Sequence, residues 1–385
     1  MKIMKKVFYC IALCGILLYG CGAEKPVRIE KVNGEELYVC DYFKTSDSTV
    51  TLNLSDVVKS LEVLKLDNDT SATVGGGTVY FSDNYMMIPA GYQQPVKLFD
   101  RQGKYLRDIG KVGRGPGEYM TLYDMQIDEK NNRIFMMPWQ TRYLYEFDME
   151  GNFVKPIKMA GGAPKATFTV ENDLLTVLAL PFKGLKWVAF QQTLDGKLLD
   201  SVPVGHFEIN ERNPYNNELF CSRDNHYVHI FRSMGKIQDT LYHYVPGKSG
   251  FIPKFTVDFG AVEPPIHYYR EFGDYFFFET SVTKPTGENT FTYVTEKSIL
   301  VNKKTRDATR FKIVNDFLGG YETSVWCFSN GYYVENIVPE RLKEKLEKVL
   351  EKGGLDKAME KKLTDIVNGI DEENDNNYVI YGRLK

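Results

Sequence analysis

Apolar and polar residues alternate along most of the chain in short runs that end at glycine, asparagine or aspartate. This pattern is typical of β-hairpins, because those residues supply the positive φ that tight turns need. The hairpin in residues 96–107 turns at Gly103 and leads into a glycine-rich loop, and similar hairpins follow it. Glycines occupy four successive turns of this kind, spaced 48, 45 and 51 residues apart: Gly103, Gly151, Gly196 and Gly247.

A repeat of this length predicts the fold. The blades of β-propellers recur at roughly 40 to 50 residues, and a lone hairpin cannot bury its own face, so neighbouring repeats must stack. A fifth hairpin turns at Asn302–Asp307. We therefore predict an all-β fold, a β-propeller of four-stranded blades. A β-sandwich that does not close is the alternative.

The two ends of the chain supply a sixth blade. Residues 324–337 form a hairpin around Asn330 and Gly331, and residues 377–384 form a third strand. Ser60–Leu66 alternates correctly and has no hairpin partner of its own, so we predict that it is the fourth strand. The result is a closed six-bladed propeller, because closure removes exposed strand edges that invite aggregation.

One segment, residues 339–369, interrupts the strand pattern within the last blade. Two sets of apolar residues recur at helical spacing on either side of Gly353 and Gly354, which predicts two short amphipathic helices. These sets are Leu342, Leu346, Val349 and Leu350, followed by Leu355, Met359, Leu363 and Ile366. The helices either cover the propeller or present a docking surface for a partner.

The first residues predict export and lipidation. Three lysines precede a short apolar run, Val7–Leu18, and residues 18–21 resemble the lipobox of lipoprotein signal peptides. The apolar run is too short to span a bilayer. We expect cleavage after residue 20 and a lipid on Cys21, which would tether a soluble domain to the membrane. The alternative is an ordinary cleaved signal peptide.

The domain organisation follows from these features. Residues 1–20 are the predicted signal peptide, and residues 59–385 are the propeller. Residues 21–58 are polar with little sustained periodicity, which predicts a tether and N-terminal extension. Within it, Glu36–Phe43 is the one stretch that could add a strand to the outside of a blade.

Charge and cysteine content limit the classes of partner and of fold stabilisation that we expect. The chain has 48 basic and 51 acidic residues. Loss of Lys2, Lys5 and Lys6 leaves 45 basic residues and a net charge near −6. Nucleic acid is therefore not expected as a partner, because phosphate binding needs a basic surface. Only three cysteines follow Cys21 and none forms a CxxC pair, so no disulfide framework is indicated.

Several motifs resemble a known family. Residues 97–119 resemble the strand-turn-strand-loop unit of NHL-type propellers, and the whole pattern resembles the six-bladed β-propeller lipoproteins of Bacteroidetes. The resemblance covers residues 56–385 and rests on residues 98–104, 113–119, 239–242, 258–260, Asn315-Asp316 and Gly319-Gly320. It implies a monomeric outer-membrane lipoprotein without implying a ligand, since the family has no agreed activity. No run of acidic residues follows Cys21, which favours the periplasmic side over the cell surface.

Three connections between blades carry candidate binding residues. In a propeller these connections share one rim with the opening of the central channel, and three of them, residues 110–119, 204–207 and 315–321, are unusual here. Their charged, amide and aromatic side chains fit an anionic or hydroxyl-rich ligand; alternatively, the first loop is only a tight turn. The candidates are Arg114, Glu118, Tyr119, His206, Asn315, Asp316 and Tyr321.

No catalytic signature accompanies this rim. Gly75–Gly77 lacks the lysine and helix of a phosphate loop, and no serine nucleophile elbow is present. The five histidines show no metal-ligand spacing, so we expect neither a metal nor another cofactor. The sequence thus favours an envelope module that binds a glycan, a peptide or a partner protein. A propeller hydrolase or lyase, possibly metal-dependent, acting on a carbohydrate or lactone is the alternative.

Overall fold

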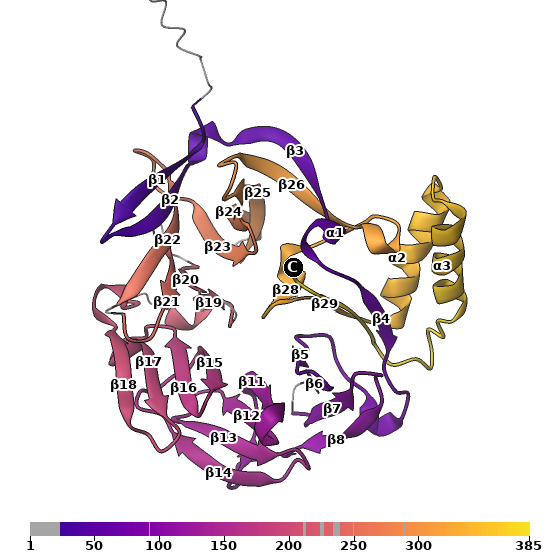
Figure 1. Ribbon diagram of the computed structural model, residues 1–385, viewed down its shortest axis with the longest axis horizontal. Coiled ribbons are helices and arrows are strands. Elements are labelled where there is room, and N and C mark those ends of the chain that lie inside the picture. The colour runs from indigo at the N-terminus through magenta and orange to yellow at the C-terminus, as the bar shows by residue number, and fades with distance from the viewer. Residues whose placement is uncertain are drawn as a thin grey trace, which may run out of the picture.

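The computed structural model describes residues 24–385, apart from residues 92, 211–212, 224–226, 234–238, 249 and 288–289 and the side chain of Phe291. The predicted signal peptide and Cys21 therefore lie outside the described residues. Six blades, each built on four antiparallel strands, surround a central axis (Figure 1). The prediction of a six-bladed propeller is confirmed.

The first three blades follow one another along the chain, and the first strand of each lies nearest the axis (Figure 1). Blade 1 contains β5 (Tyr80–Phe81), β6 (Tyr85–Pro89), β7 (Val96–Asp100) and β8 (Tyr105–Ile109). Blade 2 contains β11 (Leu122–Asp128), β12 (Arg133–Pro138), β13 (Tyr143–Asp148) and β14 (Phe153–Lys158). Blade 3 contains β15 (Ala166–Glu171), β16 (Leu174–Ala179), β17 (Trp187–Thr193) and β18 (Leu198–Pro203). A short parallel pair, β9 (Lys111–Val112) and β10 (Glu118–Tyr119), lies between blades 1 and 2.

The last three blades complete the ring. Blade 4 contains β19 (Glu218–Cys221), β20 (Tyr227–Phe231), β21 (Leu241–Tyr244) and β22 (Phe251–Asp258). Blade 5 contains β23 (Ile266–Phe272), β24 (Tyr275–Gly287), β25 (Thr290–Asn302) and β26 (Ala308–Asn315), with β27 (Tyr321–Thr323) paired to β26. Blade 6 contains β28 (Phe328–Ser329), β29 (Tyr332–Ile337), β30 (Tyr378–Arg383) and β4 (Glu62–Lys65).

The turn glycines have two structural roles. Gly103, Gly151, Gly196 and Gly247 all have a positive φ between the last two strands of their blades. In addition, a Cβ on Gly103 would lie 2.5 Å from the main-chain oxygen of Lys65, which belongs to the outer strand of the preceding blade. A side chain at such a turn would therefore strain the backbone and separate two neighbouring blades.

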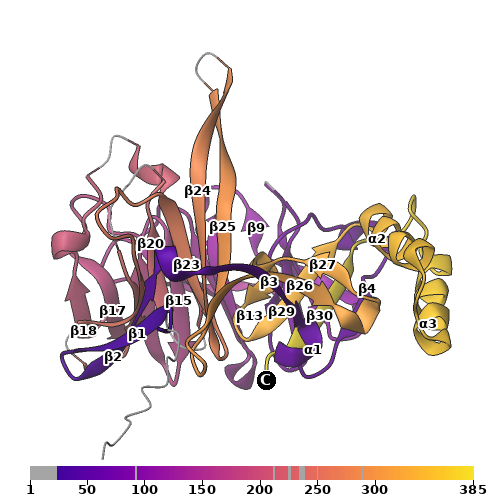
Figure 2. The same cartoon turned by 90° about the horizontal axis from the view of Figure 1, so that it is seen from above.

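We distinguish two faces of the ring. The turns at Gly103, Gly151 and Gly196 lie on one face, which we call the turn face. The loops between the second and third strands of each blade and the connections between blades lie on the opposite face. The long β24–β25 hairpin projects from that second face (Figure 2), which we therefore call the hairpin face.

The segment before the ring differs from the expected tether. β1 (Val27–Val32) and β2 (Glu35–Asp41) form a hairpin, and β2 adds to the outer edge of blade 4 by parallel pairing with β22. β3 (Ser46–Asn53) pairs in parallel with β26 on blade 5. The segment wraps around the outside of both blades (Figure 1). The tether interpretation is thus wrong for residues 27–53, because their backbones pair with the outer edges of two blades; the extra strand expected at residues 36–43 is confirmed.

The N-terminal strand closes the ring as predicted. β4 pairs antiparallel with β30, and the short helix α1 (Leu54–Val57) leads into this seam. Leu64 packs among buried residues of blades 1 and 6, including Val379 and Phe99. Strands from the two ends of the chain therefore share one blade and one core.

The late insertion consists of two helices, α2 (Pro339–Lys352) and α3 (Lys357–Asn368), as predicted. Leu342, Leu346 and Leu363 are fully buried against blades 5 and 6, so the helices cover the outside of the ring. Within the described residues, no helix combines the length and the apolar character that crossing a membrane requires.

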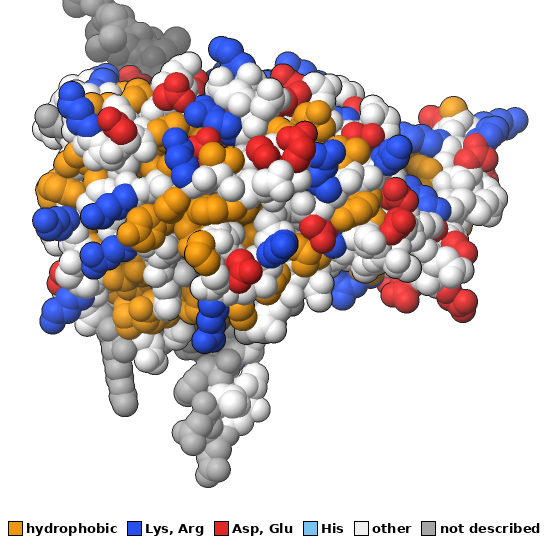
Figure 3. Space-filling view, turned by 90° about the horizontal axis from the view of Figure 1, so that it is seen from below, with side chains coloured by type: hydrophobic (Ala, Val, Ile, Leu, Met, Phe, Trp, Pro, Cys, Tyr) orange, Lys and Arg blue, Asp and Glu red, His pale blue; other side chains and the backbone are white. Residues whose placement is uncertain are grey.

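The outer strands of blades 2 and 3 have no covering strand. Val154 on β14 and Leu198 and Leu199 on β18 are exposed. Hydrophobic side chains gather among lysines and arginines over this side of the ring (Figure 3). Blades 4 and 5 differ in this respect, because β2 covers the outer strand of blade 4 and β3 covers that of blade 5.

The seam between β4 and β30 gives the first prediction. Gly382 lies in β30, where a Cβ would meet the main-chain oxygen of Ser60 and the side chain of Val58. Gly382→Ala should lower the free energy of unfolding by about 1–3 kcal/mol, the usual cost of overpacking. Urea unfolding measures this loss. The control Gly76→Ala, where a Cβ meets nothing within 4 Å, should change stability by about 0.5 kcal/mol or less; equal stability of both variants would contradict a tightly closed seam.

Candidate functional site

The first predicted loop is mainly a structural turn. Tyr119 is buried, and its hydroxyl donates to the carbonyl of Ile109 at 2.5 Å and accepts from the amide of Val96 at 2.9 Å. Burial raises the pKa of Tyr119 to about 12. The Glu118 carboxylate accepts from the amide of Gly115, whereas Arg114 is exposed. Tyr119 thus pins the loop to blade 1.

The third predicted loop joins blade 5 to the late helices. Asn315 donates to the Tyr321 hydroxyl at 3.0 Å, and that hydroxyl donates to Glu335 at 2.8 Å. Lys345 of α2 binds the other Glu335 oxygen at 2.6 Å. Asp316 accepts from the amide of Ser55 at 2.9 Å. These residues therefore have partners that fasten α1 and α2 to the ring.

The second predicted loop stands apart from the other two. His206 is exposed and stacks on Phe207, with ring centroids 4.0 Å apart. The carbonyl of Phe207 accepts from Arg232 at 2.9 Å. The structure thus places the seven candidates in three separate groups, after blades 1, 3 and 5. Of the seven, Tyr119 also lines the cavity described next.

A cavity of about 310 Å³ opens on the hairpin face between blades 1 and 2. Its polar lining includes Tyr80, Gln94, Thr121, Tyr123 and Asp124. Burial and the negative charge of Asp124 raise the pKa of the Tyr80 phenol well above its usual value, so this hydroxyl stays protonated. The remaining lining is largely apolar, from Pro89, Val96, Met120, Leu122 and Met125. Such a mixture is typical of small-molecule sites.

Arg223 forms the floor beneath this cavity. It follows β19 of blade 4, and its guanidinium binds Asp124 at 2.5 Å and the carbonyls of Met125 and Phe168 at 2.6 and 2.9 Å. It also lies over the ring of Tyr80, 5.5 Å from its centroid. The side chain is 14% exposed. Arg223 therefore reaches across the axis from blade 4 to blades 1, 2 and 3.

The carboxylate of Asp124 is fully used by these neighbours. One oxygen accepts from Arg223 and from the amide of Met125, and the other accepts from the Thr167 hydroxyl at 2.6 Å and the amide of Phe168 at 3.0 Å. Four donors therefore contact this carboxylate. Asp124 is accordingly a structural anchor of the cavity floor.

Two exposed aromatic residues, which we call the aromatic rim, lie outside the cavity lining on the hairpin face. Trp139 lies in the loop after β12, and its amide binds the carbonyl of Thr121 in the cavity wall at 2.9 Å. Tyr215 lies on the connection between blades 3 and 4, with its ring 6.5 Å from Trp139 and 4.9 Å from Phe182. Trp139 is 44% exposed and Tyr215 50% exposed. Two aromatic rings thus remain open to solvent on the face where the cavity opens.

A lysine fixes this rim in place. Lys165 donates to the carbonyls of Tyr215 and Asn217 and binds Glu218 at 2.9 Å. Glu218 also accepts from the hydroxyl of Tyr123, which lines the cavity. The rim and the cavity wall therefore belong to one hydrogen-bonded unit.

Sequence reasoning missed Trp139, Tyr215 and Arg223. All seven predicted candidates lie in connections between blades. The loops between the second and third strands of each blade open on the same face. An inspection of those loops would have found Trp139, an aromatic residue just after a predicted strand. No local sequence pattern indicates Arg223, because its partners are 55, 98 and 99 residues away in sequence.

Arg223 gives the second prediction. Arg223→Met would leave the Asp124 carboxylate buried without its counter-ion, which typically costs about 3–5 kcal/mol. Chemical denaturation should therefore show a loss of that size. The matched control Arg114→Met alters an exposed arginine and should change stability by about 0.5 kcal/mol or less. Similar midpoints for the two variants would exclude the proposed floor.

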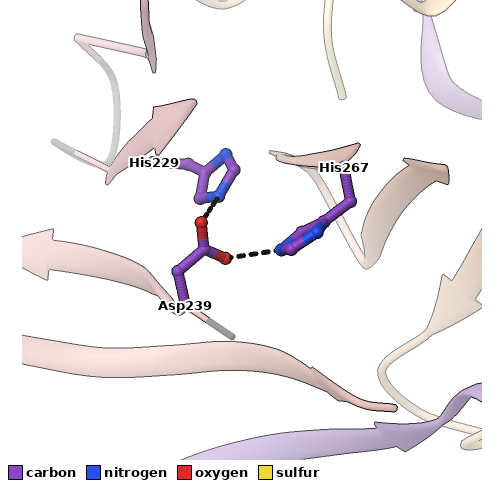
Figure 4. Close-up of side chains that lie close together, drawn as sticks. All are labelled: His229, Asp239 and His267. Carbon is purple, nitrogen blue, oxygen red and sulfur yellow. Dashed lines mark hydrogen bonds and ion pairs between the residues drawn. The ribbon is translucent and has the colours of Figure 1, made fainter. Parts of the chain in front are cut away.

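A second cluster lies at the interface of blades 4 and 5 (Figure 4). Asp239 binds Nε2 of His229 at 3.0 Å and Nε2 of His267 at 2.9 Å. The two imidazoles are 0% and 2% exposed. Their ligand atoms lie within 4.8 Å of one another, so this group is the candidate metal centre among the described residues.

The hydrogen bonds fit an ion pair better than a metal centre. Nδ1 of His229 accepts from the amide of Tyr269 at 3.1 Å, so the neutral ring must carry its hydrogen on Nε2, where a metal would bind. Nδ1 of His267 faces the carbonyl of Pro265 at 2.7 Å, while Nε2 faces Asp239. Both ring nitrogens of His267 therefore face acceptors, an arrangement that suits the doubly protonated imidazolium.

The third prediction concerns pH. Although burial lowers the pKa of His267, the negative charge of Asp239 and the hydrogen bonds raise it overall above its ordinary value; the pKa of Asp239 is lowered in spite of burial by the two histidines. Asp239 therefore stabilises the fold above about pH 3.8, and His267 does so below about pH 6.5. The His267 contribution is lost as pH rises through its raised folded pKa.

Thermal unfolding between pH 5 and pH 9 tests this linkage. The stability difference between the wild type and His267→Gln should be largest near pH 5 to 6 and should shrink toward pH 9. The control His206→Gln removes an exposed histidine and should show no such dependence. A difference that is constant with pH would contradict a buried imidazolium.

Comparisons with known proteins agree with this fold. The chain forms a six-bladed propeller. It belongs to the family described as "Domain of unknown function (DUF4934)", whose model matches residues 37–383. A comparison with curated proteins gave no match.

Two solved structures are similar in fold. A "Putative exported protein (BF0058)" from Bacteroides fragilis NCTC 9343 is 14% identical with a TM-score of 0.56, covering 89% of this chain and 99% of that chain. A member of the duf4221 family from Bacteroides vulgatus is 11% identical with a TM-score of 0.45, covering 86% and 97% of the two chains. At these identities the similarity to the first structure shows the shared fold alone.

Proposed function

We propose that this chain is a lipid-anchored propeller of the cell envelope that binds a glycan at the cavity and aromatic rim of its hairpin face. The observation that carries this proposal is the pair of exposed rings, Trp139 and Tyr215, on the same face as a preformed cavity with both apolar and polar lining. Aromatic faces stack on the apolar faces of sugar rings, and a few placed polar groups orient the ligand. Tyr80, Gln94 and Thr121 supply hydroxyl and amide groups suited to sugar hydroxyls.

The charge of the cavity favours a neutral ligand. Its one charged lining residue, Asp124, is neutralised by Arg223, and the Lys165–Glu218 pair beneath the rim is also balanced. A peptide or partner protein is the other binding partner that the sequence allowed. A hydrolase or lyase receives less support, because Asp124 already accepts four hydrogen bonds and is held by Arg223.

The envelope location rests on the first residues. The lipobox-like residues 18–21 support export and a lipid on Cys21, and a protein of similar fold is described as exported. Because strands begin at Val27, only a few residues separate Cys21 from the folded ring. The outer membrane, its periplasmic side and membership of the NHL-like lipoproteins of Bacteroidetes are part of the same proposal.

The fourth prediction tests the ligand. Trp139→Ala and Tyr215→Ala should each weaken binding to an array of bacterial-envelope oligosaccharides by about tenfold or more, equivalent to about 1.4 kcal/mol. Both side chains are exposed, so the melting temperature should change little. Phe43→Ala removes an exposed ring on the outside of blades 4 and 5 and serves as the control. Binding to a peptide array alone, unaffected by either rim substitution, would contradict a glycan site.

A further inference from the structure

The described chain begins at a fixed point on the outside of blades 4 and 5. Glu24 binds Lys44 at 2.7 Å, and Lys25 binds Asp307 at 2.8 Å. Cys21 precedes Glu24 by three residues, which span at most about 10 Å when fully extended. A lipid on Cys21, as proposed above, would therefore hold this side of the ring close to the bilayer.

The same side carries exposed apolar side chains. Phe43 is 62% exposed and adjoins Lys44 in the 3-10 helix η1 (Tyr42–Lys44), and Val262 is 52% exposed. A Cβ on Gly260, two residues before Val262, would lie 3.5 Å from the Phe43 ring. We call the surface formed by Phe43 and Val262 the anchor-side patch.

Aromatic rings pack at the base of this patch. Tyr42 packs edge-on against Phe43 with centroids 5.4 Å apart, and it contacts the buried Phe259 at 5.2 Å. Lys297 lies 4.3 Å from the centre of the Tyr42 ring. Full packing beneath Phe43 leaves its ring directed outward.

The cations around the anchor-side patch are all paired, and acidic residues outnumber them. Lys44 also faces Asp41 at 3.6 Å, and Arg28 binds Asp258 at 3.0 Å. With the Glu24 and Asp307 pairs, each of these cations has an acidic partner. Exposed apolar tips suit the interface of a lipid bilayer, and the paired cations around them do not form the lysine and arginine clusters that select anionic lipids.

We propose that the anchor-side patch inserts into the bilayer surface, so that the ring stands on the side of blades 4 and 5. This proposal rests on the proposed lipid at Cys21. In this orientation the axis of the propeller lies along the membrane plane. Blades 1 and 2, which hold the cavity, lie across the ring from this side (Figure 1), so the glycan site would remain accessible.

Fluorescence quenching in proteoliposomes tests the orientation. The full lipidated chain, carrying bimane on Phe43→Cys or Val262→Cys, is reconstituted in vesicles of phosphatidylethanolamine and phosphatidylglycerol with or without nitroxide-labelled lipid. The control is Tyr293→Cys on the projecting β25, where the native side chain is 52% exposed. Cys40 is buried and Cys221 and Cys327 are partly buried, and the labelled wild type gives their background.

The expected result is at least twofold quenching at positions 43 and 262 and none at position 293, with or without phosphatidylglycerol. Equal quenching at all three positions, or none at 43 and 262 in protein that floats with the vesicles, overturns the orientation while leaving the anchor intact. Flotation distinguishes the anchor itself: Cys21→Ser should not float. If the wild type also fails to float, both the anchor and this orientation are overturned.

Discussion

The ion pair between Arg223 and Asp124 is the interaction on which the centre of the molecule depends. Propeller blades contact mainly their neighbours, yet Arg223 extends from blade 4 to main-chain and side-chain groups of blades 2 and 3 and to the ring of Tyr80 in blade 1. Its own amide binds Asn330 of blade 6 at 3.1 Å. One residue thus links five blades at the axis.

This crossing also determines what the molecule can bind. Because Arg223 and Asp124 neutralise each other, the cavity above them has a closed floor with no free charge. A second hollow of about 360 Å³ lies on the other side of Arg223, lined by Gln126, Thr169 and Glu171. Arg223 therefore separates this hollow from the cavity, and the aromatic rim of Trp139 and Tyr215 lies on the face where the cavity opens.

Much of the fold could be predicted from local sequence, whereas little of the site could. The turn glycines, the closing strand and the late helices follow from turn chemistry and periodicity, which are properties of neighbouring residues. Residues 27–53 showed weak periodicity because each strand covers only one outer edge. Tyr119 and Tyr321 looked like rim residues, but their hydroxyls are committed to partners that only the folded ring brings near. The role of Arg223 could not be predicted for the same reason, since no local sequence pattern indicates a contact across the axis.

A double-mutant cycle at the axis tests the central claim most directly. Free energies of unfolding are measured for Arg223→Met, Asp124→Leu and the double variant. If the two residues form one buried ion pair, the double variant should recover much of the loss of each single variant, with a coupling free energy of about 3 kcal/mol. Additive losses, with coupling near zero, would show that Arg223 and Asp124 act independently and that the cavity has no such floor.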